Sequence, residues 1–167
     1  MLLAAVVLLL SGCTDKKIYG DNGDSNQIVG EKTVSFSISS DGAVSGGEAA
    51  ATVSINDNPG FLTMALKIEF DPQVMQLTKI ENGTDFADYN FVPAKELKNG
   101  CWVSWFTAGL QNLPKNCELM TLYFHVSDTA EPGKYLISIS PADDGSIVDG
   151  NKNPMVVTGG KSVIIVK

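Results

Sequence analysis

The chain has 167 residues and a net charge of −7, because 19 aspartates and glutamates face 12 basic residues, every one of which is a lysine. An acidic chain without arginine argues against a nucleic-acid partner, since phosphate binding relies on clustered cations and on the bidentate arginine fork. The length corresponds to one domain, large enough to bury a full core without a structural metal.

The N-terminus has the pattern of an export signal. Residues 2–9 are all apolar and lead into Leu10-Ser11-Gly12-Cys13. This run is too short to span a bilayer as a structural helix, and it ends in small residues. It resembles the signal of bacterial lipoproteins, which implies that residues 1–12 are removed and that Cys13 is acylated. The acylated chain is then expected outside the cytoplasm, anchored to the cell membrane. No lysine or arginine precedes the apolar run, which departs from the usual signal, and the alternative is an ordinary apolar N-terminus with a chance cysteine.

Residues 13–31 are predicted to be a flexible tether, because their Gly, Asp, Asn and Ser content cannot bury enough apolar surface to fold alone. Apolar and polar residues then alternate with period two, which predicts strands. We expect strands at 33–39, 51–55, 63–70, 74–80, 86–92 (with a bend), 101–107, 119–126, 135–140 and 162–166. Nine short strands separated by turn sequences, with no helical periodicity, predict an all-β sandwich over residues 32–167.

The order of these elements resembles the cohesin modules of cellulosome scaffolding proteins. The most specific stretch is residues 60–77, in which Phe70 precedes Asp71-Pro72-Gln73-Val74, and a glycine, Gly83, follows the next strand. Residues 99–102, 118–126 and 149–151 agree as well. The resemblance implies a nine-stranded jelly roll with strands eight, three, six and five in one sheet. It also implies a non-catalytic module without a cofactor, whose partner is a dockerin domain docked on that sheet. Dockerins of this family need calcium to fold.

The candidate partner-binding residues come from the alternation in residues 101–107. If Trp102, Ser104 and Phe106 point into the core, then Val103, Trp105 and Thr107 face outward, and an exposed apolar patch with an aromatic is a candidate interaction surface. The alternative for Trp105 is packing beneath a loop. By resemblance to the family, the partner-binding set is Thr63, Ala65, Lys67, Glu69, Tyr89, Phe91, Val92, Val103, Trp105 and Thr107. The family often has Asn or Asp where Thr63 and Ala65 stand, so the preference here is expected to be more apolar. Lys67 and Glu69 also fit a solvated ion pair.

The two remaining cysteines, Cys101 and Cys117, leave two possibilities open. An exported protein permits a disulfide, but two buried free thiols fit equally well. His125 is the only histidine, so a transition-metal site is not expected. Asp143 and Asp144 are adjacent in a loop and no nucleophile-elbow motif is present, so we expect no enzyme activity and no metal site.

Two other functions remain open at this stage. A carbohydrate-binding sandwich is the alternative, in which Trp105 and Tyr89 form an aromatic platform for a polysaccharide. A structural role in an envelope assembly, in which edge strands add partners, is a third possibility.

Overall fold

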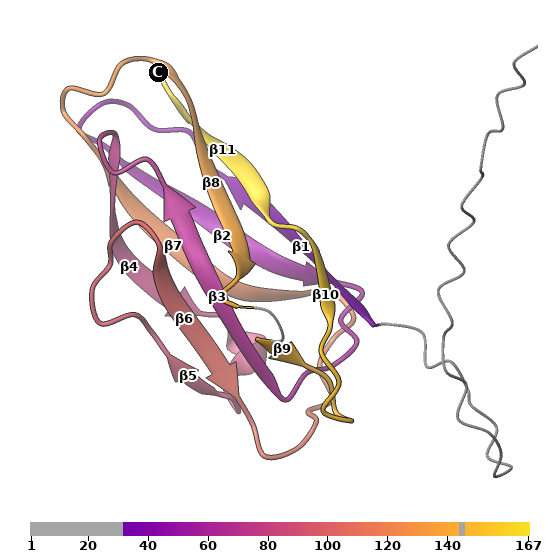
Figure 1. Ribbon diagram of the computed structural model, residues 1–167. Helices are drawn as coiled ribbons and strands as arrows, with labels where there is room; N and C mark the ends of the chain where they lie inside the picture. The colour runs from indigo at the N-terminus through magenta and orange to yellow at the C-terminus, as the bar shows by residue number, and fades with distance from the viewer. Residues whose placement is uncertain (1–31, 144–145) are drawn as a thin grey trace, which may run out of the picture.

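The computed structural model describes residues 32–143 and 146–167, which form a sandwich of two β-sheets (Figure 1). The expected signal segment, Cys13, the tether and Asp144 lie outside the described residues. The elements in chain order are β1 (Thr33–Ser40), β2 (Glu48–Asn56), β3 (Thr63–Phe70), β4 (Met75–Asn82), the 3₁₀ helix η1 (Thr84–Phe86), β5 (Asn90–Val92), β6 (Cys101–Phe106), β7 (Cys117–Val126), β8 (Gly133–Pro141), β9 (Ile147–Val148), β10 (Val156–Gly159) and β11 (Lys161–Val166).

The strands form two sheets, which we call the β3 sheet and the β7 sheet after one inner strand of each. The β3 sheet has the order β11-β8-β3-β6-β5, and the β7 sheet has the order β10-β1-β2-β7-β4. The β3 sheet lies in front of the β7 sheet in Figure 1. β1 and β10 pair in parallel, whereas the other paired strands run antiparallel. The predicted sandwich is confirmed, and so is the neighbourhood of strands eight, three, six and five.

Eleven strands are present among the described residues, whereas the sequence predicted nine. The two missed strands, β9 and β10, have two and four residues, which is too short for an alternation to be recognised. The segment expected as a bent strand at 86–92 begins instead with η1, and only Asn90–Val92 pairs with β6. The apolar residue that ends η1, Phe86, is fully buried, so its side chain belongs to a helical turn rather than to a strand face.

The core lies between the sheets and is made by alternating side chains. β3 buries Met64, Leu66, Ile68 and Phe70, and β7 buries Leu122, Phe124 and Val126. The rings of Phe70 and Phe124 meet edge to face with centroids 5.4 Å apart, which joins the two sheets. Leu119 and Met120 are consecutive and both buried because the β2–β7 register shifts between Val53 and Ser54, as expected of a β-bulge.

Glycines make two features of the fold possible. A Cβ on Gly83, just after β4, would stand 1.9 Å from the carbonyl oxygen of Glu118, so only glycine lets these backbones approach. Gly159 and Gly160 have φ of +79° and +80°, which side chains disfavour. They carry the chain from β10 in the β7 sheet to β11 in the β3 sheet.

Candidate partner-binding surface

The outer face of the β3 sheet carries exposed aromatic side chains. On β3 the outward residues are Thr63, Ala65, Lys67 and Glu69, as the sequence predicted. On β6 the outward residues are Trp102, Ser104 and Phe106. Trp102 is 51% exposed and Phe106 is 47% exposed, so about half of each side chain is in contact with water. An apolar patch of this kind is typical of an interaction site.

Val103 and Trp105 were predicted to face outward, and that prediction is wrong. Both are buried, with Trp105 fully inaccessible. The indole N–H of Trp105 donates to Oδ1 of Asn82 on β4 at 2.7 Å, so the tryptophan connects the two sheets. Its ring also packs on Phe91, with centroids 5.2 Å apart. The core position is favourable because the large ring is removed from water and its single polar group is satisfied.

The other predicted partner-binding residues are divided between core and surface. Tyr89 is buried, and its hydroxyl donates to the carbonyl oxygen of Phe61 at 3.0 Å. Burial raises the pKa of Tyr89 to about 12. Phe91 is half-buried against Trp105, and Thr107, just beyond β6, donates to the carbonyl oxygen of Gly109. Only Val92 of this group stands on the outer face, at 49% exposed.

The composition of β6 contains a signal that could have identified its outward side. The alternating set of Cys101, Val103 and Trp105 is wholly apolar, whereas the other set has Ser104 at its centre. A hydroxyl is costly to bury without a partner, so the set with the serine is the better candidate for the solvent face. Trp102 and Phe106 are therefore the surface residues that the sequence analysis missed.

The strand register brings three exposed apolar side chains together on the β5–β6 side of the face. Ala65 lies opposite Ser104 across β3 and β6, and Ser104 lies opposite Val92 across β6 and β5. Trp102 and Phe106 stand on either side of Ser104 along β6. We call Trp102, Phe106 and Val92 the aromatic cluster. Small side chains at Ala65 and Ser104 lie between its two rings.

A lysine–glutamate pair occupies the middle of the face. Nζ of Lys67 lies 2.6 Å from Oε1 of Glu69, and the hydroxyl of Ser138 on β8 donates to Oε2 of Glu69 at 3.3 Å. The hydrogen bond from Lys67 holds the pKa of Glu69 below its ordinary value. The predicted solvated pair is thus present, and its charges cancel each other.

A second apolar group lies at the β8–β11 side of the same face. Leu136 is 53% exposed and pairs with Val163, and Ile165 next along β11 is 44% exposed. We call these three residues the aliphatic cluster. Lys134, opposite Ile165, and Lys161, opposite Ser138, stand on either side of it.

The outer face of the β7 sheet differs in chemistry. Strands β2 and β7 present mainly hydroxyl and charged groups on this face. Nδ1 of His125 lies 3.0 Å from Oε1 of Glu48, and Tyr123 donates to Glu81 at 2.5 Å. Among the described residues, none of the large exposed apolar side chains lies on β1, β2, β4 or β7, and one, Val156, lies on the edge strand β10. The two faces of the sandwich are therefore unequal, and the β3 sheet carries the apolar one.

Cys101 and Cys117 are both free and buried. They lie in different sheets, Cys101 opposite Ile68 and Cys117 opposite Ile55. Burial raises the pKa of both thiols, that of Cys117 to about 11. Of the two possibilities left open by the sequence, the structure has the pair of buried thiols.

Within residues 32–143 and 146–167, no group of three or more His, Cys, Asp or Glu side chains is placed to hold a metal ion. No helix in the same described ranges is long and apolar enough to cross a membrane.

A family model for the cohesin domain matches residues 34–164, which is most of the chain. The chain therefore belongs to the cohesin family. No curated protein sequence matches it significantly.

Solved cohesin structures share this fold at low sequence identity. A non-cellulosomal cohesin from the archaeon Archaeoglobus fulgidus superposes with a TM-score of 0.66 and 16% identity, covering 81% of this chain and 91% of that one. A cohesin in a type I cohesin–dockerin complex from Clostridium thermocellum gives 0.64 and 15%, covering 81% and 100%. The third cohesin ScaC from Acetivibrio cellulolyticus, in complex with the ScaB dockerin, gives 0.60 and 22%, covering 79% and 99%. At these identities the likeness supports the fold.

Proposed function

We propose that this protein is a non-catalytic receptor module that binds a dockerin domain on the outer face of its β3 sheet. The observation that carries the proposal is the exposure of Trp102 and Phe106 on β6, in the sheet that contains β8, β3, β6 and β5 as neighbours. Aromatic side chains are enriched among the residues that dominate binding energy in protein interfaces. Membership of the cohesin family and the dockerin complexes of similar structures support this choice of partner.

A second element of the proposal is anchorage of the module outside the cell. Cys13 follows an apolar run and a Leu-Ser-Gly tripeptide, and 18 residues of the chain separate it from Lys32, where the described domain begins. An acyl group on Cys13 would hold the module at a membrane while the segment between gives it reach. In cells that express the full chain, Cys13→Ser is expected to move the protein from the membrane fraction to the soluble fraction. Equal membrane association of both forms would contradict lipidation at Cys13.

Titration of the domain with a panel of dockerins, in calcium and in EDTA, tests the binding proposal. We expect at least one dockerin to bind in calcium, and we expect the complex to be lost on chelation because dockerins of the family need calcium to fold. Failure of every dockerin to bind, or binding that persists in EDTA, would contradict the proposal.

The polysaccharide alternative keeps one supporting observation, since Trp102 and Phe106 are both exposed on one strand. The earlier platform of Trp105 and Tyr89 is excluded because both side chains are buried. Affinity electrophoresis on cellulose, xylan and starch separates the two functions. Retardation by a polysaccharide that is lost in Trp102→Ala favours sugar binding, and unretarded migration of the wild type favours the dockerin.

A further inference from the structure

The outer face of the β3 sheet differs in chemistry between its β5–β6 end and its β8–β11 end. This difference affects which dockerin the face can bind. The aromatic cluster stands on β5 and β6, and the aliphatic cluster stands on β8 and β11. The neutralised Lys67–Glu69 pair separates them on β3. An inference drawn from this arrangement rests on the dockerin-binding function proposed above.

The strand register sets the span between the two clusters. Trp102 lies opposite Lys67, and Lys67 lies opposite Ser140, which is four residues beyond Leu136 on β8. With about 4.8 Å between strands and 3.3 Å per residue, Trp102 and Leu136 are about 16 Å apart. The same arithmetic puts Phe106 about 28 Å from Leu136. One helix of about three to five turns, lying diagonally across the sheet, therefore touches both clusters.

Positive charge gathers at the aliphatic end. On the described strands of this sheet, the outer face carries three lysines, Lys67, Lys134 and Lys161, but only one carboxylate, Glu69, although acidic residues outnumber lysines in the whole chain. Lys67 is neutralised by Glu69, whereas Lys134 and Lys161 form no ion pair within the described part of the chain. Asp71 follows β3 at this end, and its carboxylate accepts the backbone N–H of Gln73.

The aromatic end favours an apolar contact. Ala65 has no side-chain group that can hydrogen-bond, and Ser104 beside it is flanked by two exposed rings. A charged or amide side chain pressed against this position would lose its water without gaining a full set of partners. A large apolar side chain would instead bury against Trp102, Phe106 and Val92.

We propose that this face selects a dockerin helix with two unlike ends. One end presents large apolar side chains over Ala65 and Ser104, between Trp102 and Phe106. The other end presents one or more carboxylates to Lys134 and Lys161 beside the aliphatic cluster. The lysines fix the direction of the helix on the sheet, because reversing the helix would put its carboxylates on the aromatic cluster.

Selection from a displayed library tests this proposal. A dockerin scaffold with its helix-surface positions randomised is selected in calcium against the wild-type domain and against Lys134→Glu/Lys161→Glu. Lys95→Glu/Lys152→Glu is the matched control, because it changes the net charge equally at two exposed loop lysines outside the sheet. Affinity of the selected dockerins for Trp102→Ala shows whether they bind at the aromatic cluster.

We expect dockerins selected on the wild type to carry Asp or Glu at one end of the helix and large apolar residues at the other. Their affinity should fall about tenfold for Lys134→Glu/Lys161→Glu and less than about twofold for the control. Selection on the charge-reversed domain should enrich Lys or Arg at the same positions. Absence of any binder, binders without charge bias, or equal affinity for both double variants would overturn the proposal. If the library yields the expected binders but no natural dockerin binds, the result counts against the proposed function and not against this inference. The library can be selected whether or not a natural dockerin recognises this face.

Discussion

Trp102 and Trp105 are separated by two residues on β6 and point to opposite faces of the β3 sheet. Trp105 is fully buried and donates a hydrogen bond to Asn82 of the opposing sheet, whereas Trp102 is 51% exposed. The same residue type therefore contributes to folding at one position and is available to a partner at the other. Substitution of each by alanine separates these roles.

We expect Trp105→Ala to lower the free energy of unfolding by about 3–5 kcal/mol, because it removes a large buried ring and leaves a cavity between the sheets. Trp102→Ala should change it by no more than about 0.5 kcal/mol, as is usual for an exposed residue. Urea unfolding followed by circular dichroism measures both. Similar losses of unfolding free energy for the two variants would contradict the burial of Trp105 and the exposure of Trp102.

The sequence was sufficient to predict the sandwich, because period-two alternation depends only on which side chains avoid water. The orientation of β6 was predicted wrongly because both alternating sets contain a tryptophan, although Ser104 favours its own set as the outward one. The bond from Trp105 to Asn82, which joins residues 23 positions apart, stabilises the observed orientation and is not visible in a local pattern. The outward residues of β3 were predicted correctly because each of them alternates with a large apolar residue.

At the scale of elements, one buried carboxylate orders the loop between β9 and β10. Oδ1 of Asp149 accepts the backbone N–H groups of Asn151 and Asn153 at 2.8 and 2.9 Å, and Oδ2 lies 3.2 Å from Nζ of Lys32. The backbone hydrogen bond from Asn153, helped by that from Asn151 and by Lys32, holds the pKa of Asp149 below its ordinary value. The carbonyl oxygen of Lys32 also accepts the backbone N–H of Val156. These contacts hold the residue that precedes β1 against the segment from Asp149 to Val156.

The lowered pKa predicts a pH dependence of stability. A carboxyl group whose pKa is lower in the folded state stabilises the fold at pH values above its unfolded pKa, near 4, and this contribution disappears as the pH falls through the folded value. Asp149→Asn should therefore lower the urea midpoint at pH 6 and make progressively less difference below pH 4. Asp88→Asn, at an exposed carboxylate between η1 and β5, is the control. A loss for Asp149→Asn that stays constant from pH 6 to pH 2 would contradict this role.

The short strands β9 and β10 could not be predicted from the sequence pattern. β10 contains only Val156–Gly159 and is held by parallel pairing with β1, a segment more than 100 residues earlier in the chain. A four-residue strand is stabilised by its partner strand rather than by its own composition, so its existence becomes evident only in the folded molecule.

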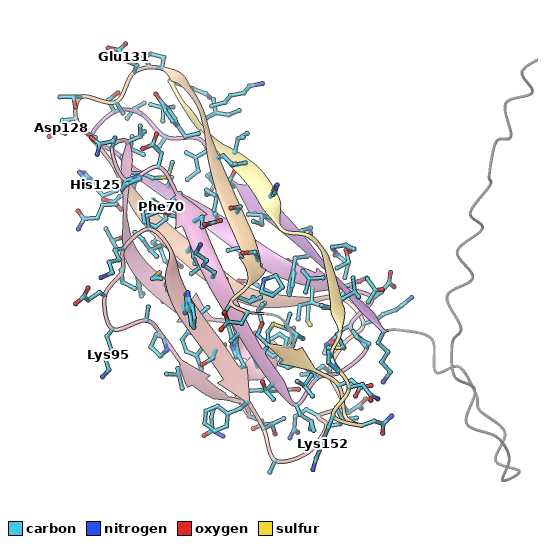
Figure 2. The ribbon with its side chains drawn as sticks, viewed as in Figure 1. Phe70, Lys95, His125, Asp128, Glu131 and Lys152 are labelled. Atoms are coloured by element: carbon cyan, nitrogen blue, oxygen red, sulfur yellow. The ribbon has the colours of Figure 1, made fainter. Side chains whose placement is uncertain are left out.

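For the whole molecule, the two ends of the described chain lie at the ends of the long axis, away from the outer face of the β3 sheet (Figure 1). Figure 2 shows Glu131 and Lys152 near opposite ends of the long axis. Lys32, where the described domain begins, contacts Asp149 close to the Lys152 end, and the C-terminus lies at the opposite end in Figure 1. The outer face of the β3 sheet lies along the side between these ends. The described domain therefore begins at one end of the sandwich and not on this face (Figure 1).

The two outer faces also give the molecule an internal control. The β3 sheet exposes Trp102 and Phe106, whereas the β7 sheet presents Tyr123 bonded to Glu81 among hydroxyls and charges. Trp102 and Tyr123 both lie on inner strands of their sheets, but only Trp102 belongs to the proposed interface. Removal of the Trp102 ring should therefore weaken the binding of a partner more than removal of the Tyr123 ring does.

Isothermal titration of a dockerin that binds the wild type, into Trp102→Ala and Tyr123→Ala, shows whether the partner docks on the outer face of the β3 sheet. Trp102→Ala should weaken the complex by about 2 kcal/mol or more, which is roughly thirtyfold, because it removes a large ring of the aromatic cluster from the interface. Tyr123→Ala should bind with nearly the wild-type affinity. Unchanged affinity in Trp102→Ala, together with a loss in Tyr123→Ala, would place the partner on the β7 sheet and contradict docking on the β3 sheet.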